Sequence, residues 1–300
     1  MGQRVFVTGA TGVLGRRVVP RLVEAGHDVT AAVRTEAKAD GMRAAGATAL
    51  VVDLFDRAGM RAAIDGHDSI AQLATHIPTG ASAAQRSAWS TNDRLRGEAA
   101  PAIAAAAVEA GVRRYVQESI TFPYVDGGGQ WIDEDRARDY FWGNECTVAA
   151  EAAAVGFTSA GRVGIVLRFA LFMAPDSAHT QAFVSAARNG SFEVAGPADS
   201  YISFVHVDDA AASVVAALDA PAGTYNVAEP DPVRRSAHRE ALAAVVGRSR
   251  LSLVPSLAER TGHDAANCLA RSHRISSQRL SDVSTWKPTI RCIERWGDLP

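Results

Sequence analysis

The sequence of 300 residues is short of lysine, cysteine and long hydrophobic runs. Only Lys38 and Lys287 are lysines among 31 basic residues, so chemistry that needs an ammonium group has two candidates. The three cysteines lie far apart and form no C-x-x-C pair. That pattern argues against a disulfide framework or a thiolate metal site and is typical of a reducing compartment. No H-E-x-x-H or similar spacing occurs either, so we expect no bound metal.

Other absences narrow the class of partner. A net charge of −2 at pH 7 gives no general electrostatic attraction for nucleic acid or anionic lipid. No run of about 18 apolar residues is present to span a membrane, and the chain opens directly on a predicted strand, with no basic and apolar leader before it. We therefore expect a cytoplasmic protein, a monomer or a homodimer, that acts on a small molecule and binds neither nucleic acid nor membrane.

The first 170 residues alternate short β-branched runs with longer stretches of helical spacing. Gly26 and Gly111 follow two of the predicted helices, where a glycine often ends a helix. This alternation predicts an α/β fold built on a doubly wound parallel sheet. The predicted strands are 4–7, 28–33, 47–52, 69–73, 114–117 and 164–169, with helices such as 15–25 and 99–110 between them.

The strongest local motif is Thr8-Gly9-Ala10-Thr11-Gly12-Val13-Leu14-Gly15, between the first predicted strand and the first helix. One glycine allows the tight turn, the second lets a diphosphate approach the backbone, and the third lets the helix pack close to the strand. The free N–H groups at the helix start then bind the phosphates. The spacing is G-x-x-G-x-x-G, and a glycine-rich turn without a ligand is the alternative. The predicted contacts are Gly9, Thr11, Gly12, Val13, Leu14 and Gly15.

The end of the second strand indicates which dinucleotide is bound. An acid there accepts from the ribose 2′-hydroxyl, whereas an arginine pairs with a 2′-phosphate. The sequence has Arg34 and no acid, with Arg16 and Lys38 able to add charge. We therefore predict NADP(H); a solvated surface arginine is the alternative. Asp53, which closes the third strand, is expected to accept from the adenine amino group, or is simply an exposed carboxylate.

After about residue 170 the elements become shorter and proline and glycine more frequent. A strand is predicted over 201–207, and a helix over 210–218 with Asp208 and Asp209 at its favourable N-terminal end. We predict a nucleotide-binding domain over 1–170, to which 201–218 returns. Residues 171–200 and 219–300 form a smaller C-terminal substrate-binding lobe.

Together these features resemble the extended short-chain dehydrogenase/reductase family, in its epimerase/dehydratase-like branch. The resemblance covers nearly the whole chain and implies a Rossmann fold. Trp286-Lys287-Pro288 is similar to the family's closing Gly-Trp-x-Pro, with Thr285 in place of the glycine. Other matching positions include Asn92, 111–116, Leu167-Arg168 and 206–209. The predicted cofactor contacts are completed by Leu54, Leu73, Ala74, Thr75 and Phe169.

The family's chemistry is carried by a serine after the fifth strand and by a Tyr-x-x-x-Lys on the next helix. The resemblance assigns Ser119 to the serine and Tyr140 to the tyrosine, but Asn144 stands at the lysine position. No Tyr-x-x-x-Lys occurs anywhere in the chain. Asn144 can hydrogen-bond the ribose, yet it brings no charge to lower the pKa of the tyrosine. Tyr140 is then a neutral donor, or only a packing residue beside two other aromatic residues.

Aromatic and apolar residues are expected to form a rim near the nicotinamide, suited to a flat hydrophobic substrate. Ala174-Pro175 replaces the family's frequent Gly-Pro, which weakens the case for a sugar nucleotide. His76 follows the fourth strand and is a candidate proton donor, or a loop histidine without chemistry. The predicted substrate contacts are His76, Phe122, Tyr124, Trp131, Phe172 and Met173.

Three functions remain open. The first is an NADPH-dependent ketoreductase of a bulky aromatic polyketide such as an angucyclinone, similar to the triad-deficient reductases of bacterial polyketide pathways. Its proton would come from Ser119, from water or from a phenol of the substrate. The second is a non-catalytic NADP-sensing protein. The third is a sugar-nucleotide epimerase or dehydratase, which Asn144 disfavours because such reactions rely on an activated tyrosine.

Overall fold

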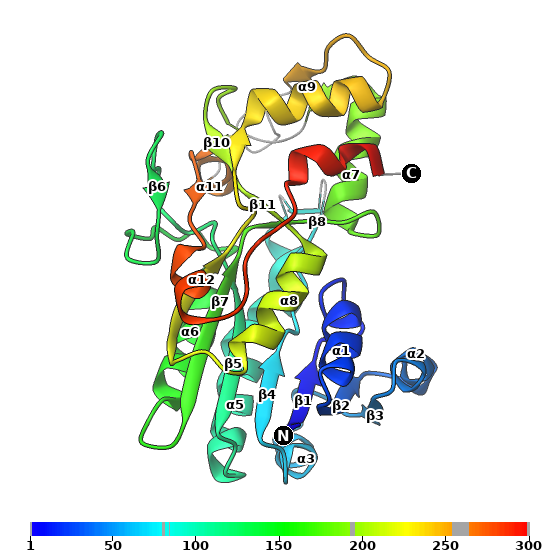
Figure 1. Ribbon diagram of the computed structural model, residues 1–300, viewed down its shortest axis with the longest axis vertical. Helices are drawn as coiled ribbons and strands as arrows, with labels where there is room; N and C mark the ends of the chain where they lie inside the picture. The colour runs from blue at the N-terminus through cyan, green and yellow to red at the C-terminus, as the bar shows by residue number, and fades with distance from the viewer. Residues whose placement is uncertain (1, 80–81, 84, 193–195, 254–263, 299–300) are drawn as a thin grey trace.

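Seven parallel strands form the central sheet, in the order β12-β7-β5-β4-β1-β2-β3. The computed structural model describes residues 2–79, 82–83, 85–192, 196–253 and 264–298. Figure 1 shows the sheet in the lower part of the molecule. The strands are β1 (Arg4–Thr8), β2 (Asp28–Val33), β3 (Thr48–Val51), β4 (Ser69–Gln72), β5 (Arg114–Ile120), β7 (Val163–Phe169) and β12 (Gly223–Val227).

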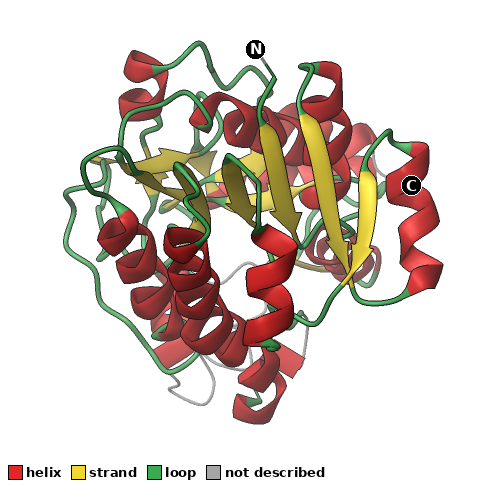
Figure 2. Cartoon of the chain, turned by 90° about the horizontal axis from the view of Figure 1, so that it is seen from below, coloured by secondary structure: helices red, strands yellow, loops and turns green. Residues whose placement is uncertain are grey.

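Helices cover both faces of this sheet, so the predicted doubly wound Rossmann fold is confirmed (Figure 2). On one face α1 (Gly15–Glu24) packs against α8 (Val207–Ala217). On the other face α5 (Ala100–Glu109) lies between α3 (Arg57–Ile64) and α6 (Cys146–Phe157). The chain turns out of α1 and α5 at Gly26 and Gly111, whose φ angles of 82° and 74° suit glycine.

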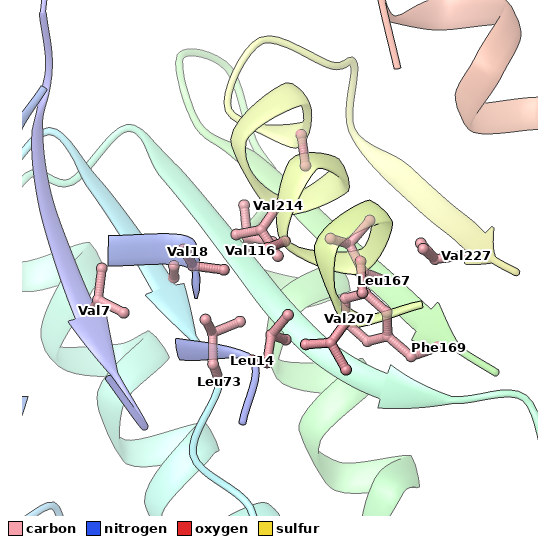
Figure 3. Close-up of a cluster of buried hydrophobic side chains, with 14 of the residues drawn as sticks. Val7, Leu14, Val18, Leu73, Val116, Leu167, Phe169, Val207, Val214 and Val227 are labelled. Carbon is pink, nitrogen blue, oxygen red and sulfur yellow. The ribbon is translucent and has the colours of Figure 1, made fainter. Parts of the chain in front are cut away.

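A continuous apolar core joins the sheet to α1 and α8 (Figure 3). Val7 and Val116 of the sheet, Val18 of α1 and Val214 of α8 are fully buried. Near-continuous hydrophobic strands are typical of a parallel sheet covered on both faces. This packing fixes the start of α1 against the carboxyl end of β1, where the glycine motif lies.

A smaller lobe lies at the carboxyl end of the sheet, in the upper part of Figure 1. It contains α7 (Ala178–Arg188) and α9 (Arg235–Val245), and its core includes Phe192, Phe204 and Trp296. Its remaining elements are β8 (Leu171–Met173), β9 (Ser191–Phe192), β10 (Tyr201–Ile202), β11 (Phe204–His206), β13 (Val233–Arg234), β14 (Ser252–Leu253), α11 (Asp264–Ala270) and η5 (Cys292–Asp298).

Two predictions about the second half of the chain were wrong in detail. The strand expected over 201–207 is broken into β10 and β11, which pair with β13 and β8 and not with the main sheet. The return to the nucleotide-binding part extends beyond residue 218, because β12 forms the edge of the seven-stranded sheet and α12 (Gln278–Val283) packs on it. Residues 219–300 therefore do not belong wholly to the smaller lobe.

The C-terminal segment is fastened to the start of α8 by Asp209. Its carboxylate accepts hydrogen bonds from the backbone N–H groups of Thr289 and Ile290, both at 2.8 Å. Its backbone carbonyl accepts one from the indole of Trp286 at 2.9 Å. Trp286 of the Trp-Lys-Pro signature thus helps to attach the end of the chain to α8.

Membrane-spanning helices and metal-binding clusters are both absent from the described ranges. No helix there is long and apolar enough to cross a bilayer. Within the same ranges no group of three or more His, Cys, Asp and Glu side chains is arranged to hold a metal ion. Cys146, Cys268 and Cys292 form no disulfide.

Candidate functional site

A cavity of about 930 Å³ lies at the carboxyl ends of the strands, between the sheet and the smaller lobe. Ligands of open α/β sheets bind at this edge. Every residue predicted to contact the cofactor lines the cavity, so the structure brings the whole predicted set together. These residues are Gly9, Thr11, Gly12, Val13, Leu14, Gly15, Arg34, Asp53, Leu54, Leu73, Ala74, Thr75 and Phe169.

The glycine motif forms a tight turn that only glycine accommodates at two positions. Gly9 has a φ of +63°, and a Cβ there would lie 2.6 Å from the carbonyl of Leu73. A Cβ on Gly15 would lie 2.2 Å from the carbonyl oxygen of Gly9. The turn is closed by a 2.9 Å hydrogen bond from the N–H of Gly12 to that same oxygen. We refer to the part of the cavity beside this turn as the phosphate end, since the start of α1 faces it.

Positive side chains surround the phosphate end. Arg34 follows β2 and Lys38 closes the short helix η1 (Glu36–Lys38); both are exposed and line the cavity. Neither side chain has a hydrogen bond or ion pair to another described residue. Arg16 also lines the cavity, where its guanidinium lies 2.7 Å from the Asp176 carboxylate of the smaller lobe. A phosphorylated ribose at this end could bind Arg34 and Lys38 without breaking a contact between either of them and another described residue.

The end of β4 is held next to the glycine turn. The hydroxyl of Thr8 accepts a hydrogen bond from the N–H of Leu73 at 3.2 Å. The N–H of His76 donates at 3.2 Å to the side-chain oxygen of the fully buried Asn92. Asn92 in turn contacts the thiol of Cys146 on α6. This chain of contacts fixes the backbone on which Ala74, Thr75 and His76 face the cavity.

The other part of the cavity, which we call the apolar end, is lined mainly by aromatic and aliphatic side chains. Phe122 and Phe172 lie there, as predicted from the sequence, and Phe183 of α7 joins them. His179, one turn before Phe183, also lines the cavity, and burial lowers the pKa of its imidazole. A neutral imidazole among phenyl rings suits a flat, largely apolar ligand. Further members are Ile77, Trp89, Ile120, Phe141, Leu171, Ile202 and Leu269.

Ser119 does not face the cavity. Successive side chains of a strand point to opposite sides, so Glu118 and Ile120 line the cavity while Ser119 points away. The Ser119 hydroxyl donates at 2.6 Å to Glu151 of α6, a carboxylate that Arg168 also binds. The assignment of Ser119 as a catalytic residue is corrected: its hydroxyl is engaged in the core behind β5.

Tyr140 and Asn144 do not share a helix face, because α6 begins only at Cys146. Tyr140 is half-buried beside the Arg138 guanidinium and is not among the cavity residues. Burial raises the pKa of its phenol. Asn144 does line the cavity, yet its side-chain oxygen accepts from the N–H of Phe141 at 2.9 Å. The pair therefore does not reproduce the family's Tyr-x-x-x-Lys geometry.

Three predicted substrate contacts lie elsewhere. Tyr124 is fully buried in the core, where its hydroxyl donates to Asn226 at 2.8 Å and accepts from Arg168 at 2.7 Å. Trp131 is 47% exposed on the surface and stacks against Arg274. Met173 is 1% exposed inside the core of the smaller lobe. None of these three side chains lines the cavity.

Among the charged lining residues that sequence reasoning missed is Glu118. It is 4% exposed, and both of its carboxylate oxygens accept from one nitrogen of the buried Arg96, at 2.7 and 2.8 Å. Burial raises the pKa of Glu118, and the Arg96 guanidinium acts in the opposite direction. The signal was present in the sequence, since a glutamate two residues before Ile120 shares that residue's side of β5.

The described residues fit a nicotinamide dinucleotide, NAD(P)(H). The turn that requires glycine at Gly9 and Gly15 lines the cavity at the start of α1, where backbone N–H groups of a helix bind phosphates. Arg34 and Lys38 supply hydrogen-bond donors that no other described residue engages. Asp53 also lines the cavity; one of its carboxylate oxygens accepts from the N–H of Phe55, and the other can accept from a ligand. The glycine turn would hold the diphosphate of such a cofactor, and Phe169 lines the same cavity at the end of β7.

Comparison with known proteins gives the family. Residues 9–155 match a family model described as NAD(P)H-binding. A Streptomyces protein named 3-diazoavenalumate denitrifying reductase is 30% identical over 300 residues, covering 95% of this chain and 96% of the relative. The chain belongs to the NAD(P)H-binding family that this model describes and that includes this relative.

Solved structures give the same fold at lower identity. MoeE5 in complex with UDP-glucuronic acid and NAD is similar with a TM-score of 0.79 and 20% identity, over 99% of this chain and 97% of that one. UDP-glucuronic acid 4-epimerase from Bacillus cereus, in complex with UDP-glucuronic acid and NAD, gives a TM-score of 0.75 at 14% identity, over 98% and 96%. Identities this low establish the fold and leave the substrate open.

Proposed function

We propose that this protein is an NADPH-dependent reductase of an aromatic small molecule. The observation that carries the proposal is the division of the cavity into two parts. Its phosphate end has the glycine turn with the cations Arg34 and Lys38, neither of which pairs with another described residue. Its apolar end is built from rings such as Phe122 and Phe183. The first suits a phosphorylated dinucleotide and the second a flat hydrophobic acceptor.

When bound, NADPH supplies a hydride from C4 of its nicotinamide. The protein's part is then to align an acceptor at the apolar end and to keep water out, and alignment alone can provide much of the rate. Phe172 and Phe169 lie with their ring centroids 5.3 Å apart where β7 meets β8, and both line the cavity. They would form the wall against which the acceptor and the cofactor meet.

An aromatic ketone is one candidate acceptor. Its reduction to an alcohol consumes a hydride and a proton, so a proton donor must reach the carbonyl oxygen. With Ser119 and Tyr140 outside the lining, the polar side chains left for this role include His76, Thr91, Asn144 and His179. A phenol next to the carbonyl, on the substrate itself, would serve the same purpose.

An aryl diazonium ion is the second candidate, favoured by the name of the Streptomyces relative. Such an ion is already positive, so hydride addition to its terminal nitrogen gives a neutral aryl diazene. Loss of N₂ then leaves the arene, and the net reaction consumes one diazonium ion and one NADPH, giving arene, N₂ and NADP⁺. No added proton is required, which agrees with the family's proton donors lying outside the cavity lining.

The test is NADPH consumption with a panel of acceptors. Purified protein is mixed with NADPH and, in separate reactions, polycyclic aromatic ketones, aryl diazonium acids and UDP-sugars, and absorbance at about 340 nm is followed together with product mass. Acceptor-dependent NADPH loss with an alcohol or a denitrified arene as product supports the reductase. Tight NADPH binding without turnover of any acceptor would instead support the NADP-sensing protein, and UDP-sugar turnover the epimerase.

A further inference from the structure

One carboxylate of the cavity lining, that of Glu118, is not used by the reaction described above. Its side chain is 4% exposed, and the space it borders is the cavity itself. An ionised group in so buried a position is costly unless its charge is compensated. The described part of β5 contains no other charged side chain that lines the cavity.

The strand register places Glu118 in line with the glycine turn. Thr8 of β1 pairs with Gln72 of β4, and Gln72 pairs with Gln117 of β5. The residues that follow, Gly9, Leu73 and Glu118, therefore succeed one another across three adjacent strands. Since neighbouring strands lie about 4.8 Å apart, Glu118 is roughly 10 Å from the glycine turn. A dinucleotide held at that turn would extend its nicotinamide in this direction.

The carboxylate of Glu118 is paired with the guanidinium of Arg96. One nitrogen of the guanidinium donates to both carboxylate oxygens, at 2.7 and 2.8 Å, and Arg96 is only 1% exposed. Arg96 belongs to η4 (Leu95–Ala99), a single π-helical turn inside the long helix before β5, and such turns are frequent at functional sites. A carboxylate has about four acceptor positions, so Glu118 keeps free ones after binding Arg96.

The cations that line the cavity lie at one end of it. The cations that line it without a partner, Arg34 and Lys38, lie at the phosphate end, where a dinucleotide carries its negative groups. The carboxylate of Asp176 is bound by Arg16, and that of Asp53 lies at the end of β3. Among the described lining residues, Glu118 is the carboxylate on β5, the strand nearest to where the nicotinamide and acceptor would meet.

We propose that Glu118 selects for positive charge at the reaction centre, both the pyridinium charge of NADP⁺ and a cationic acceptor such as an aryl diazonium ion. This inference rests on the proposed reductase function. A carboxylate in a low-dielectric cavity attracts a nearby cation and opposes a nearby anion. It therefore stabilises a diazonium ion before hydride transfer, and it disfavours the alkoxide that forms when a ketone accepts a hydride. Arg96 orients Glu118 and acts through it.

The test that needs no acceptor is the ratio of the dissociation constants of NADP⁺ and NADPH. The two molecules differ at the nicotinamide, which is positively charged only in NADP⁺. Replacing Glu118→Gln keeps the shape and removes the charge, so NADP⁺ should bind about tenfold more weakly relative to NADPH than it does to the unmodified protein. Titration calorimetry with each nucleotide gives both constants.

A matched control separates this effect from general damage. Glu134 is also a buried carboxylate paired with an arginine, Arg279 at 3.1 Å, but it does not line the cavity. Glu134→Gln should leave the ratio unchanged. If Glu118→Gln unfolds because Arg96 loses its partner, the double variant Glu118→Gln/Arg96→Gln removes both charges and should shift the ratio in the same direction.

The outcomes keep the two proposals apart. A ratio that is the same in both Glu118 variants as in the unmodified protein, with NADPH still bound, would overturn the role of Glu118 and leave the reductase standing. Failure of every form to bind NADPH would overturn both. With active protein, Glu118→Gln should lower kcat/KM for an aryl diazonium acid by about tenfold or more and leave that for an aromatic ketone unchanged or raised. Equal losses with both acceptors would contradict charge selection.

Discussion

Arg34 is predicted to distinguish NADPH from NADH. It lies directly after β2, lines the cavity and has no ion pair with a described residue, so binding a 2′-phosphate breaks no existing contact. A hydrogen bond to a charged group contributes about 1.5–3 kcal/mol. Because Arg34 is exposed and Lys38 remains to bind the phosphate, the lower part of that range applies. Arg34→Ala should therefore weaken NADPH binding by roughly 10- to 30-fold.

Calorimetry with NADPH and NADH on the same variant measures this effect. The affinity for NADH should be unchanged in Arg34→Ala, and Arg34→Ala/Lys38→Ala should lose a further several-fold for NADPH only. Arg43→Ala is the control, since Arg43 is a nearby surface arginine that pairs with Glu36 and Asp40 and does not line the cavity. Equal losses for both nucleotides, or none for NADPH, would refute the assignment of the 2′-phosphate site.

Three further variants test the site and the core. Gly9→Ala should abolish measurable NADPH binding and lower the melting temperature, because its Cβ would clash with Leu73 at a φ of +63°; Gly97→Ala, with open space around its Cβ, should do neither. Asn144→Lys should give no gain in reductase rate. It should also destabilise the fold by several kcal/mol in urea titrations, because it buries an ammonium group at a position that is 1% exposed. A large gain in rate would restore Tyr140 as the proton donor. Burial lowers the pKa of His238 to about 3, so between pH 7 and pH 5 this histidine is protonated in the unfolded chain and stays neutral in the folded protein. The free energy of unfolding should therefore fall by roughly 2 kcal/mol as the pH falls over this interval. His238→Gln should show a smaller fall, and an identical fall would contradict the role of His238.

The cofactor half of the site could be predicted because its signals are local. The glycine turn and Arg34 each follow a strand directly, and Asp53 lies two residues after β3. In a parallel sheet the carboxyl ends of the strands meet at one edge. The predicted carboxyl ends of β1 to β4 lie within one residue of the observed ends, so the segments that follow these strands were located correctly. Leu73, Ala74 and Thr75 were predicted from the family resemblance, and they line the cavity at the end of β4.

The reaction half depended on details that the pattern does not fix. Ser119 and Ile120 differ by one position in β5, and one position reverses the side to which a strand residue points. Tyr140 stands at the right distance from Ser119, but the helix expected to carry it begins six residues later, at Cys146. Tyr124 was predicted to contact the substrate. Its hydroxyl lies instead in the core, because the buried side chains of Arg168 and Asn226 need it as a hydrogen-bond partner.

Other members of the cavity come from segments far away in the sequence. Phe183 and His179 lie on α7, and Leu269 on α11, and their approach to the sheet depends on how the smaller lobe packs. Glu118 was overlooked because a glutamate in a strand is usually on a solvated side. Its burial becomes understandable only with Arg96, twenty-two positions earlier in the chain, in contact.

The most direct test of the account is the fate of the hydrogen at C4 of the nicotinamide. NADPH carrying deuterium at C4 is incubated with the protein and each acceptor that causes NADPH loss, and the product is analysed by mass spectrometry and NMR. The account predicts that the deuterium leaves the nucleotide only when an aromatic acceptor is reduced, and that NADP⁺ and reduced acceptor form in equal amounts. Retention of all deuterium in the nucleotide, with NADPH tightly bound and every acceptor unchanged, would contradict hydride transfer.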